Sequence, residues 1–140
     1  MTVYRLTYYH AGNEEEWGDY YLLGYFDSRA EVEKAIAFYS GMACFSIPNF
    51  GIYRTEVSGA SGRPLTQIYC VELYLHDPGF VSEFREILGV FEEEAEADRC
   101  AQCFREDNPR LLASKTLEIE LDVFCYTLNE RGWEEGYTTG

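Results

Sequence analysis

The chain has 140 residues and a mass of 16.2 kDa, which limits it to one compact domain or two very small ones. Its 46% hydrophobic and 16% aromatic residues are enough for a folded core and exclude wholesale disorder. Asp and Glu number 25 against 11 Lys and Arg, and the net charge of −14 argues against direct binding to nucleic acid or to an anionic membrane.

The start of the chain and its cysteines favour a cytoplasmic protein. No basic and apolar leader precedes the first strand-like stretch, and no apolar run approaches the roughly 20 residues that span a bilayer. Five scattered cysteines suit a reducing compartment. Cys100 and Cys103 form a CxxC spacing inside a helical stretch, with no second ligand pair for zinc, so we interpret them as buried thiols. We expect no cofactor and no metal.

The sequence repeats itself at an offset of 65 residues. The identities cluster at a strand end and a helix start, and similar residues fill the positions between them, so we predict a tandem duplication. The identical pairs are Tyr4/Tyr69, Tyr9/Tyr74, Leu23/Leu88, Gly24/Gly89, Phe26/Phe91, Ala30/Ala95 and Glu31/Glu96.

Each copy is predicted to be a β-β-α-β unit, in chain order. Two strands rich in β-branched and aromatic residues are followed by an amphipathic helix and a closing strand. The expected strands are 3–9, 20–26 and 50–57, then 67–75, 84–91 and 116–128. The fold class is therefore α+β, with mainly antiparallel sheet and two helices packed on one face.

The two helices have recognisable ends and faces. Ser28 is the expected N-cap of the first helix, because Glu31 follows at the spacing of a capping box. Ser40-Gly41 ends this helix, and Asn108-Pro109 ends the second. The predicted core faces are Val32, Ala35, Ile36 and Tyr39 in the first, and Ala97, Cys100, Ala101 and Phe104 in the second.

The copies are predicted to span residues 1–58 and 65–140, with a link at 59–64. The stretch from Ser58 to Pro64 is rich in Gly and Ser, which is typical of a flexible connection, and it lacks the lysine of a phosphate-binding loop. Each copy alone is near the size at which a single core is marginal. We therefore expect the copies to pack as one globular unit.

Several short motifs resemble a small uncharacterised family of bacterial domains. They are an early Val-Tyr strand, a Leu-Gly-x-Phe turn, an acidic helix and a closing Trp-x-Glu-Gly-aromatic motif, here 133–137. The first copy lacks the closing motif, because Ser58 to Pro64 stands in its place. The resemblance implies a fold more than an activity.

Signatures of catalysis are mostly missing. The sequence has no Gly-x-Ser-x-Gly elbow, no His-Glu-x-x-His and no Gly-rich nucleotide motif. His10 and His76 each follow the first strand of a copy, where a general base is conceivable but surface histidines are common. The acidic loop containing Glu14, Glu15, Glu16 and Asp19 lacks the ligand spacing of a calcium loop.

Negative charge is concentrated in the second copy. Residues 1–65 hold 8 acids and 5 bases, whereas residues 66–140 hold 17 acids and 6 bases. Strict alternation from Leu117 to Val123 places Glu118, Glu120 and Asp122 on one face of a strand. Such carboxylates stand about 6.5–7 Å apart and repel by roughly 0.6 kcal/mol in water. Both copies need the fold but only one carries the charge, so we interpret this strip as a binding surface.

Further acidic and aromatic residues extend the predicted surface. Glu92, Glu93 and Glu94 begin the second helix, where the helix dipole also favours carboxylates. Tyrosine and tryptophan anchors ringed by carboxylates suit an interface with a basic protein. The other predicted contacts are Trp133, Glu134, Glu135 and Tyr137, and several of Tyr8, Tyr20, Tyr21, Tyr25, Tyr53, Tyr126 and Tyr137 are expected to be partly exposed.

Three functions remain open on the sequence. The favoured one is a non-enzymatic inhibitor that docks on a basic, nucleic-acid-handling protein by mimicking phosphates, as an immunity protein or a phage anti-defence (anti-CRISPR-type) protein does. The second is a module that binds a small ligand in a cleft between the copies. The third is an enzyme that uses His10 or His76 with a carboxylate. A homodimer through exposed strand edges is also compatible with the sequence.

Overall fold

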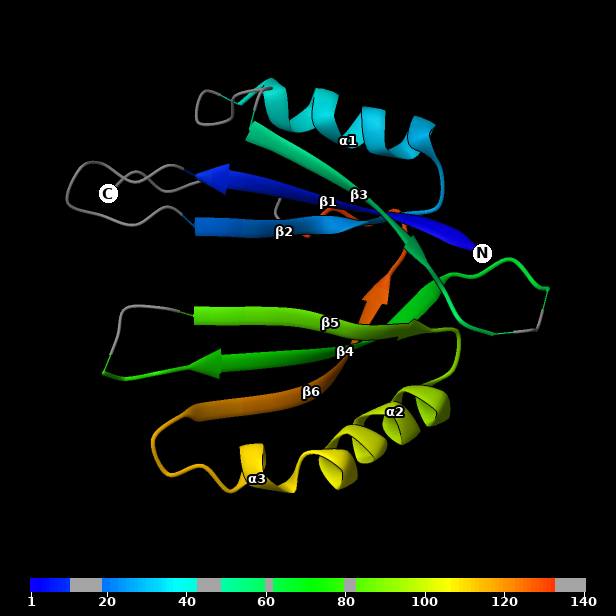
Figure 1. Ribbon diagram of the computed structural model, residues 1–140. Coiled ribbons are helices and arrows are strands. Elements are labelled where there is room, and N and C mark those ends of the chain that lie inside the picture. Colours follow the sequence, from blue (N-terminus) through cyan, green and yellow to red (C-terminus); the bar gives the residue numbers. More distant parts are fainter. Residues whose placement is uncertain (11–18, 43–48, 60–61, 80–82, 133–140) are drawn as a thin grey trace. The chain divides into compact units, whose positions relative to one another are not determined.

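The computed structural model describes residues 1–10, 19–42, 49–59, 62–79 and 83–132. In chain order its elements are β1 (Thr2–His10), β2 (Asp19–Phe26), α1 (Arg29–Ser40), β3 (Phe50–Glu56), β4 (Gln67–His76), β5 (Glu83–Phe91), α2 (Glu94–Asp107), α3 (Pro109–Leu112) and β6 (Glu118–Thr127) (Figure 1). The predicted α+β class and the tandem β-β-α-β order are confirmed. The short helix α3 is an addition that the sequence patterns did not predict, and it begins at a proline, which is favoured at a first helical position.

The strands form two antiparallel sheets of the same topology. One has the order β2-β1-β3 and the other β5-β4-β6, so the first strand of each copy is central and its third strand is an edge. Helix α1 makes its main contacts with β1 and β2, and helix α2 with β4 and β5. The third strand of each sheet is therefore the one that the helix covers least.

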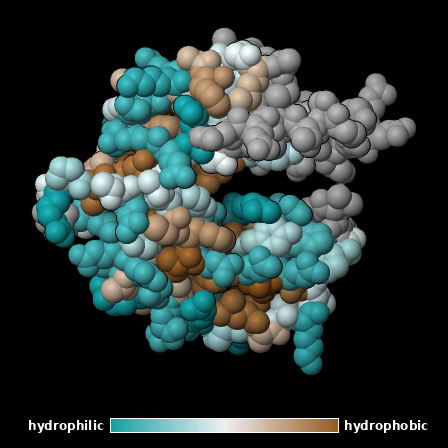
Figure 2. Space-filling model, turned by 180° about the vertical axis from the view of Figure 1, so that it is seen from behind, coloured by the Kyte–Doolittle hydropathy of each residue, from teal (hydrophilic) through white to brown (hydrophobic). Residues whose placement is uncertain are grey.

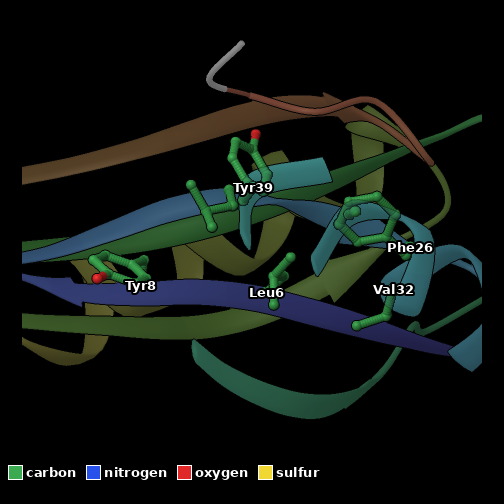
Figure 3. Packing of buried hydrophobic residues seen from close by; sticks show 7 residues of the cluster. Leu6, Tyr8, Phe26, Val32 and Tyr39 are labelled. Carbon is green, nitrogen blue, oxygen red and sulfur yellow. The ribbon is translucent and has the colours of Figure 1, made fainter. Parts of the chain in front are cut away.

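The first sheet and α1 enclose the larger core. Buried side chains from β1, β2 and α1 meet there, and Figure 3 labels five of them: Leu6, Tyr8, Phe26, Val32 and Tyr39. The predicted face of α1 is confirmed, because Val32, Ala35 and Tyr39 are buried and Ile36 packs against the same cluster. The predicted N-cap is confirmed as well, since the Ser28 hydroxyl accepts a hydrogen bond of 3.2 Å from the Glu31 N–H.

The second sheet and α2 enclose a smaller core. Its buried members are Val71, Ala97 and Ala101, with Cys100 and other half-buried side chains packed around them. The face of α2 that was predicted to point toward the core does so at Ala97, Cys100 and Ala101. Two alanines replace the larger residues of α1 at the repeat positions, so this helix fills less volume against its sheet.

The shared Leu-Gly-x-Phe turn forms a β-bulge in both copies. The pairing of β1 with β2 shifts so that Leu23 is the extra residue, and the pairing of β4 with β5 shifts so that Leu88 is. A bulge bends its strand and re-aims the extra side chain. Leu23 is fully buried, and Leu88 packs against the core of the second sheet, so the repeated motif directs one leucine inward in each copy.

The compact units of the structure do not follow the repeat boundaries. One unit contains 1–56 and 127–140, and the other contains 57–126. The residues that follow the third strand of each copy thus belong to the unit built on the other copy. The segments that follow β3 and β6, called tails below, are thus exchanged between the two copies.

The exchanged tails make equivalent hydrogen bonds. In one unit the Ser58 N–H donates to the Val90 carbonyl at 2.8 Å, and its carbonyl accepts from the Glu92 N–H at 3.0 Å. In the other the Asn129 N–H donates to the Tyr25 carbonyl at 2.8 Å, and its side-chain Oδ1 accepts from the Asp27 N–H at 3.0 Å. Tyr25 and Asp27 are the repeat counterparts of Val90 and Glu92. Each second strand therefore receives the tail of the other copy at the same place.

The C-terminal tail has further anchors in its unit. Leu128 is buried, and the Gly132 N–H donates to the Leu23 carbonyl at 2.7 Å. The guanidinium of Arg131 lies 3.8 Å from the ring centroid of Phe38, a cation–π contact with α1. Residues 128–132 are thus an integral part of the first sheet and its helix.

The absence of a side chain at Gly24 allows the C-terminal tail to lie close to β2. The φ of Gly24, +148°, is rarely adopted by other residues, and a Cβ there would lie 2.6 Å from the carbonyl oxygen of Glu130. The repeat counterpart Gly89 is constrained by its own chain, because a Cβ would lie 2.6 Å from the ring of Phe91. The conserved spacing of Leu-Gly-x-Phe between the copies therefore has a steric cause.

Replacing Gly24 by alanine is expected to lower the free energy of unfolding by at least about 1 kcal/mol, because it strains the backbone and pushes the C-terminal tail away. The measurement is urea denaturation followed by circular dichroism. Gly41→Ala is the matched control, since a Cβ at Gly41 meets nothing closer than 3.5 Å and its φ is −74°. Equal stability of the two variants would show that the tail contact is dispensable.

Candidate functional site

The predicted acidic strip lies on one face of β6. Exposure alternates along this strand: Glu118, Glu120 and Asp122 are exposed, while Ile119 and Leu121 between them are half-buried. Among the described residues, the side chains of Glu120 and Asp122 have no hydrogen-bond or ion-pair partner. The structure thus places the three carboxylates as the alternation predicted, with two of them open to solvent.

The first carboxylate of the strip has a partner on the neighbouring strand. His76 Nδ1, at the end of β4, lies 3.0 Å from the Glu118 carboxylate, whose side chain is 63% exposed. His76 also stacks with Tyr74, at a centroid distance of 6.4 Å. His76, one of the two histidines considered as a general base, is therefore paired with an exposed surface carboxylate.

Two more carboxylates join this side of the second sheet. The Tyr126 hydroxyl donates to Glu72 at 2.6 Å, and the Tyr74 hydroxyl donates to Glu83 at 3.0 Å. Burial and the hydrogen bond to Glu83 raise the pKa of Tyr74 above its ordinary value. Arg85 lies 4.8 Å from the Tyr74 ring. Glu72 and Glu83 were not predicted from the sequence, because single carboxylates on separate strands leave no local pattern.

The three glutamates at the start of α2 have different roles. Glu92 is half-buried, and its side chain occupies the space beside Gly59, where a Cβ would lie 2.4 Å from it. Glu93 is the N-cap residue and makes no side-chain capping bond, and Glu94 is exposed in the first turn. Glu92 thus helps to seat an exchanged tail, whereas Glu93 and Glu94 remain at the surface.

A groove lies between α2 and β6 in the second unit. Its volume is about 580 Å³, and the apolar side chains of Leu121 and Val123 line it together with buried Ala101. It brings one predicted carboxylate of the helix, Glu94, to the same place as one of the strand, Asp122. The remaining polar lining consists of Asp98, Arg99, Gln102 and Arg105.

A difference between the sequences of α1 and α2 could have indicated this groove. At the repeat offset, Val32 of α1 becomes Ala97 of α2, and Ile36 becomes Ala101. A helix that places alanine where its counterpart places branched residues leaves space against the sheet. The half-buried face of β6, which the strand alternation assigned simply to the core, borders that space.

Part of the predicted surface lies outside the described residues. This applies to Trp133, Glu134, Glu135 and Tyr137, to the closing motif that carried the family resemblance, and to the loop with Glu14, Glu15 and Glu16. Among the residues that are described, no group of three or more His, Cys, Asp or Glu side chains is placed to hold a metal ion. No helix in the described ranges is long and apolar enough to cross a membrane.

The tyrosines expected to be exposed divide into two groups. Tyr53 is 46% exposed and Tyr21 and Tyr126 are half-buried, so several are partly exposed as expected, whereas Tyr8 and Tyr25 are buried, at 3% and 1% exposure. Cys103 is exposed, since it lies off the inward face of α2 that Cys100 borders. The interpretation of this pair as buried thiols therefore fails for Cys103.

Comparisons of the chain with protein-family models, with curated proteins and with solved structures gave no match.

Burial raises the pKa of the Cys100 thiol, and the neighbouring Cys103 raises it further. At pH 8 we therefore expect iodoacetamide to alkylate Cys103 faster than Cys100, by roughly fivefold or more, because the thiolate is the reactive form and Cys103 is also more accessible. Peptide mapping by mass spectrometry over a time course gives both rates. The rates should converge in urea; equal rates in the native protein would contradict the burial of Cys100.

Proposed function

We propose that this chain is a non-enzymatic binding protein whose second repeat docks on a basic, nucleic-acid-handling protein. The bound surface of that partner is the one that would otherwise contact phosphates, so docking inhibits it. An immunity protein against a nuclease toxin and a phage-encoded inhibitor of a defence nuclease are the two settings that fit this chemistry.

The observation that carries the proposal is the ordered row of carboxylates on β6. Neighbouring members of the row are two residues apart on an extended strand, which spaces them by about 6.5–7 Å. Glu120 and Asp122 are exposed and, within the described part of the chain, unneutralised. A row of fixed negative charges at regular spacing is the simplest protein imitation of a phosphate backbone.

The comparison between the copies supports a role beyond folding. Strand β3 is the counterpart of β6 in the first sheet, and its sequence Phe50–Glu56 carries Arg54 and a single acid. Both edge strands complete their sheets, but only one bears the carboxylate row. The fold therefore tolerates a strand without a carboxylate row at this position, and the charge on β6 needs a separate explanation.

Aromatic side chains next to the row supply anchoring area. Phe124 follows Asp122 on the same face of β6 and is 43% exposed, and it lies 6.3 Å from the Tyr126 ring. Interfaces commonly combine exposed aromatic anchors with a charged surround that steers association. The arrangement on β6 has both parts on one strand.

The test is the rate of association with basic nucleases, with ribonuclease A and micrococcal nuclease as probes. Electrostatic steering predicts that the rate falls at least about tenfold between roughly 50 and 500 mM salt, and that the triple variant Glu118→Gln, Glu120→Gln, Asp122→Asn lowers it about tenfold at low salt. Surface plasmon resonance measures both effects. Nuclease assays with the same proteins then show whether bound enzyme loses activity.

The matched control removes the same charge from the first unit through Asp27→Asn, Glu33→Gln and Glu56→Gln. All three residues are exposed, and none lies on β6. If this variant slows association as much as the β6 variant, net charge and not the carboxylate row is responsible. A rate that does not change with salt would rule out the electrostatic mechanism.

A further inference from the structure

Strand β6 has a free edge. In its sheet it pairs with β4 alone, and no other strand among the described residues bonds to it. A strand edge presents a row of backbone donors and acceptors that can pair with another chain. This edge extends over the same residues that carry the acidic row.

The side chain of Arg105 identifies which backbone groups point outward. Its Nη2 donates to the carbonyl oxygen of Leu121 at 3.4 Å, so this carbonyl is turned away from β4. In an antiparallel strand the N–H and C=O of one residue point to the same side, and alternate residues share that side. The outward groups are therefore those of Ile119, Leu121 and Val123, and at Leu121 a long bond from a side chain occupies the position of a strand partner.

The two faces of this edge differ in chemistry. One face bears Glu118, Glu120 and Asp122, and the other bears the half-buried Leu121 and Val123 over the groove of about 580 Å³. The groove is open because α2 packs on β4 and β5 with alanines at its inward positions. Figure 2 shows apolar side chains reaching the surface in patches among hydrophilic ones on the face it presents.

We propose that the free edge of β6 is a β-augmentation site for an extended segment of the basic partner. The segment adds as a fourth strand, with Lys or Arg side chains beside the acidic row and aliphatic side chains directed into the groove. This inference rests on the proposed function and specifies how the partner is recognised. Main-chain pairing supplies affinity in this mode, and alternate side chains supply specificity.

The two faces of the edge offer different contacts to an added strand. The groove face supplies apolar area through Leu121, Val123 and Ala101, and its charged lining is mixed, with Arg99 and Arg105 beside Glu94, Asp98 and Asp122. The other face exposes Glu118 and Glu120. A segment that alternates basic and aliphatic residues therefore matches the edge best with its aliphatic side chains over the groove.

The edge strand β5 of the same sheet is less suited to this role. Its end pairs with the exchanged tail through Ser58, which forms a parallel bridge to Phe91. In the first sheet β2 receives Asn129 and Gly132 in the same way. Strand β3 is an edge as well, but it has no carboxylate row.

The test uses fluorescein-labelled peptides and the full-length protein in anisotropy titrations at about 50 mM salt, where charge interactions are weakly screened. The probe has the sequence Lys-Val-Arg-Val-Lys-Val-Arg, and its control has the same residues in blocks, Lys-Arg-Lys-Arg-Val-Val-Val. We expect the alternating peptide to bind about tenfold more tightly, because only its alternation places every basic side chain on the carboxylate face and every valine over the groove. Amide resonances of Ile119, Leu121 and Val123 should shift on binding.

Two N-methylated forms of the alternating peptide test the backbone pairing directly. Each form is methylated at alternate amides, so each blocks one edge of the extended peptide. One form should lose binding and the other should keep it, because only one edge faces β6. Equal binding by both forms, equal binding by the block peptide, or no binding of the alternating peptide would overturn the augmentation site.

The outcomes separate this inference from the proposed function. If the two peptides bind equally to the wild-type chain and both lose affinity to the Glu118→Gln, Glu120→Gln, Asp122→Asn variant, the acidic surface stands and the augmentation site falls. If the alternating peptide binds this variant as tightly as the wild type, pairing at the edge stands without charge, and the proposed electrostatic function falls.

Discussion

The exchange of third-strand tails is the constraint on which the rest of the structure depends. Each second strand ends beside residues that follow the third strand of the other copy, and the bonds are equivalent: Ser58 to Val90 in one unit and Asn129 to Tyr25 in the other. Neither unit is complete within its own stretch of sequence. A chain built in this way must fold both copies to satisfy the backbone of either, which gives a small protein a cooperativity that its separate cores could not supply.

The same exchange explains which features the two copies share. Several of their identical residues fall where the bulge and the tail seat are made, at Leu23-Gly24 and Leu88-Gly89, and others lie in the first strand and at the helix start. Other positions differ between the copies. Two inward positions of α2 hold alanine where α1 has Val32 and Ile36, and the third strand of the second copy alternates carboxylates with aliphatic residues. Conservation between the copies marks what the fold requires, and divergence marks where function is to be sought.

Sequence patterns predicted the elements well because their causes are local. The capping hydroxyl of Ser28, the inward face of α1 and the alternation along β6 all follow from neighbours a few residues away. The exchange could not be predicted, because Asn129 and Tyr25 are far apart in sequence and their bond leaves no periodic trace. The groove could be predicted only in part. The sequence shows small residues at positions 97 and 101, but only the structure shows that β6 lies beside α2, so that the space left by these alanines forms a groove. The burial of Tyr8 and Tyr25 could not be predicted for a similar reason, since alternation with polar neighbours does not reveal which face of a strand is covered.

The charge on β6 also resolves a hazard that its free edge creates. Two copies of this chain pairing edge to edge through β6 would bring carboxylates of the two strands opposite one another, about 5 Å apart, and like charges at that position destabilise a sheet. A basic segment experiences the reverse, because every carboxylate that repels a second copy attracts it. The exchanged tail at Asn129 meanwhile fixes the end of the strand, so little order is left to be gained when a partner arrives. The carboxylate row of β6 thereby disfavours pairing between two copies of this chain and favours a basic partner. The strand that carries the row is already extended before the partner binds.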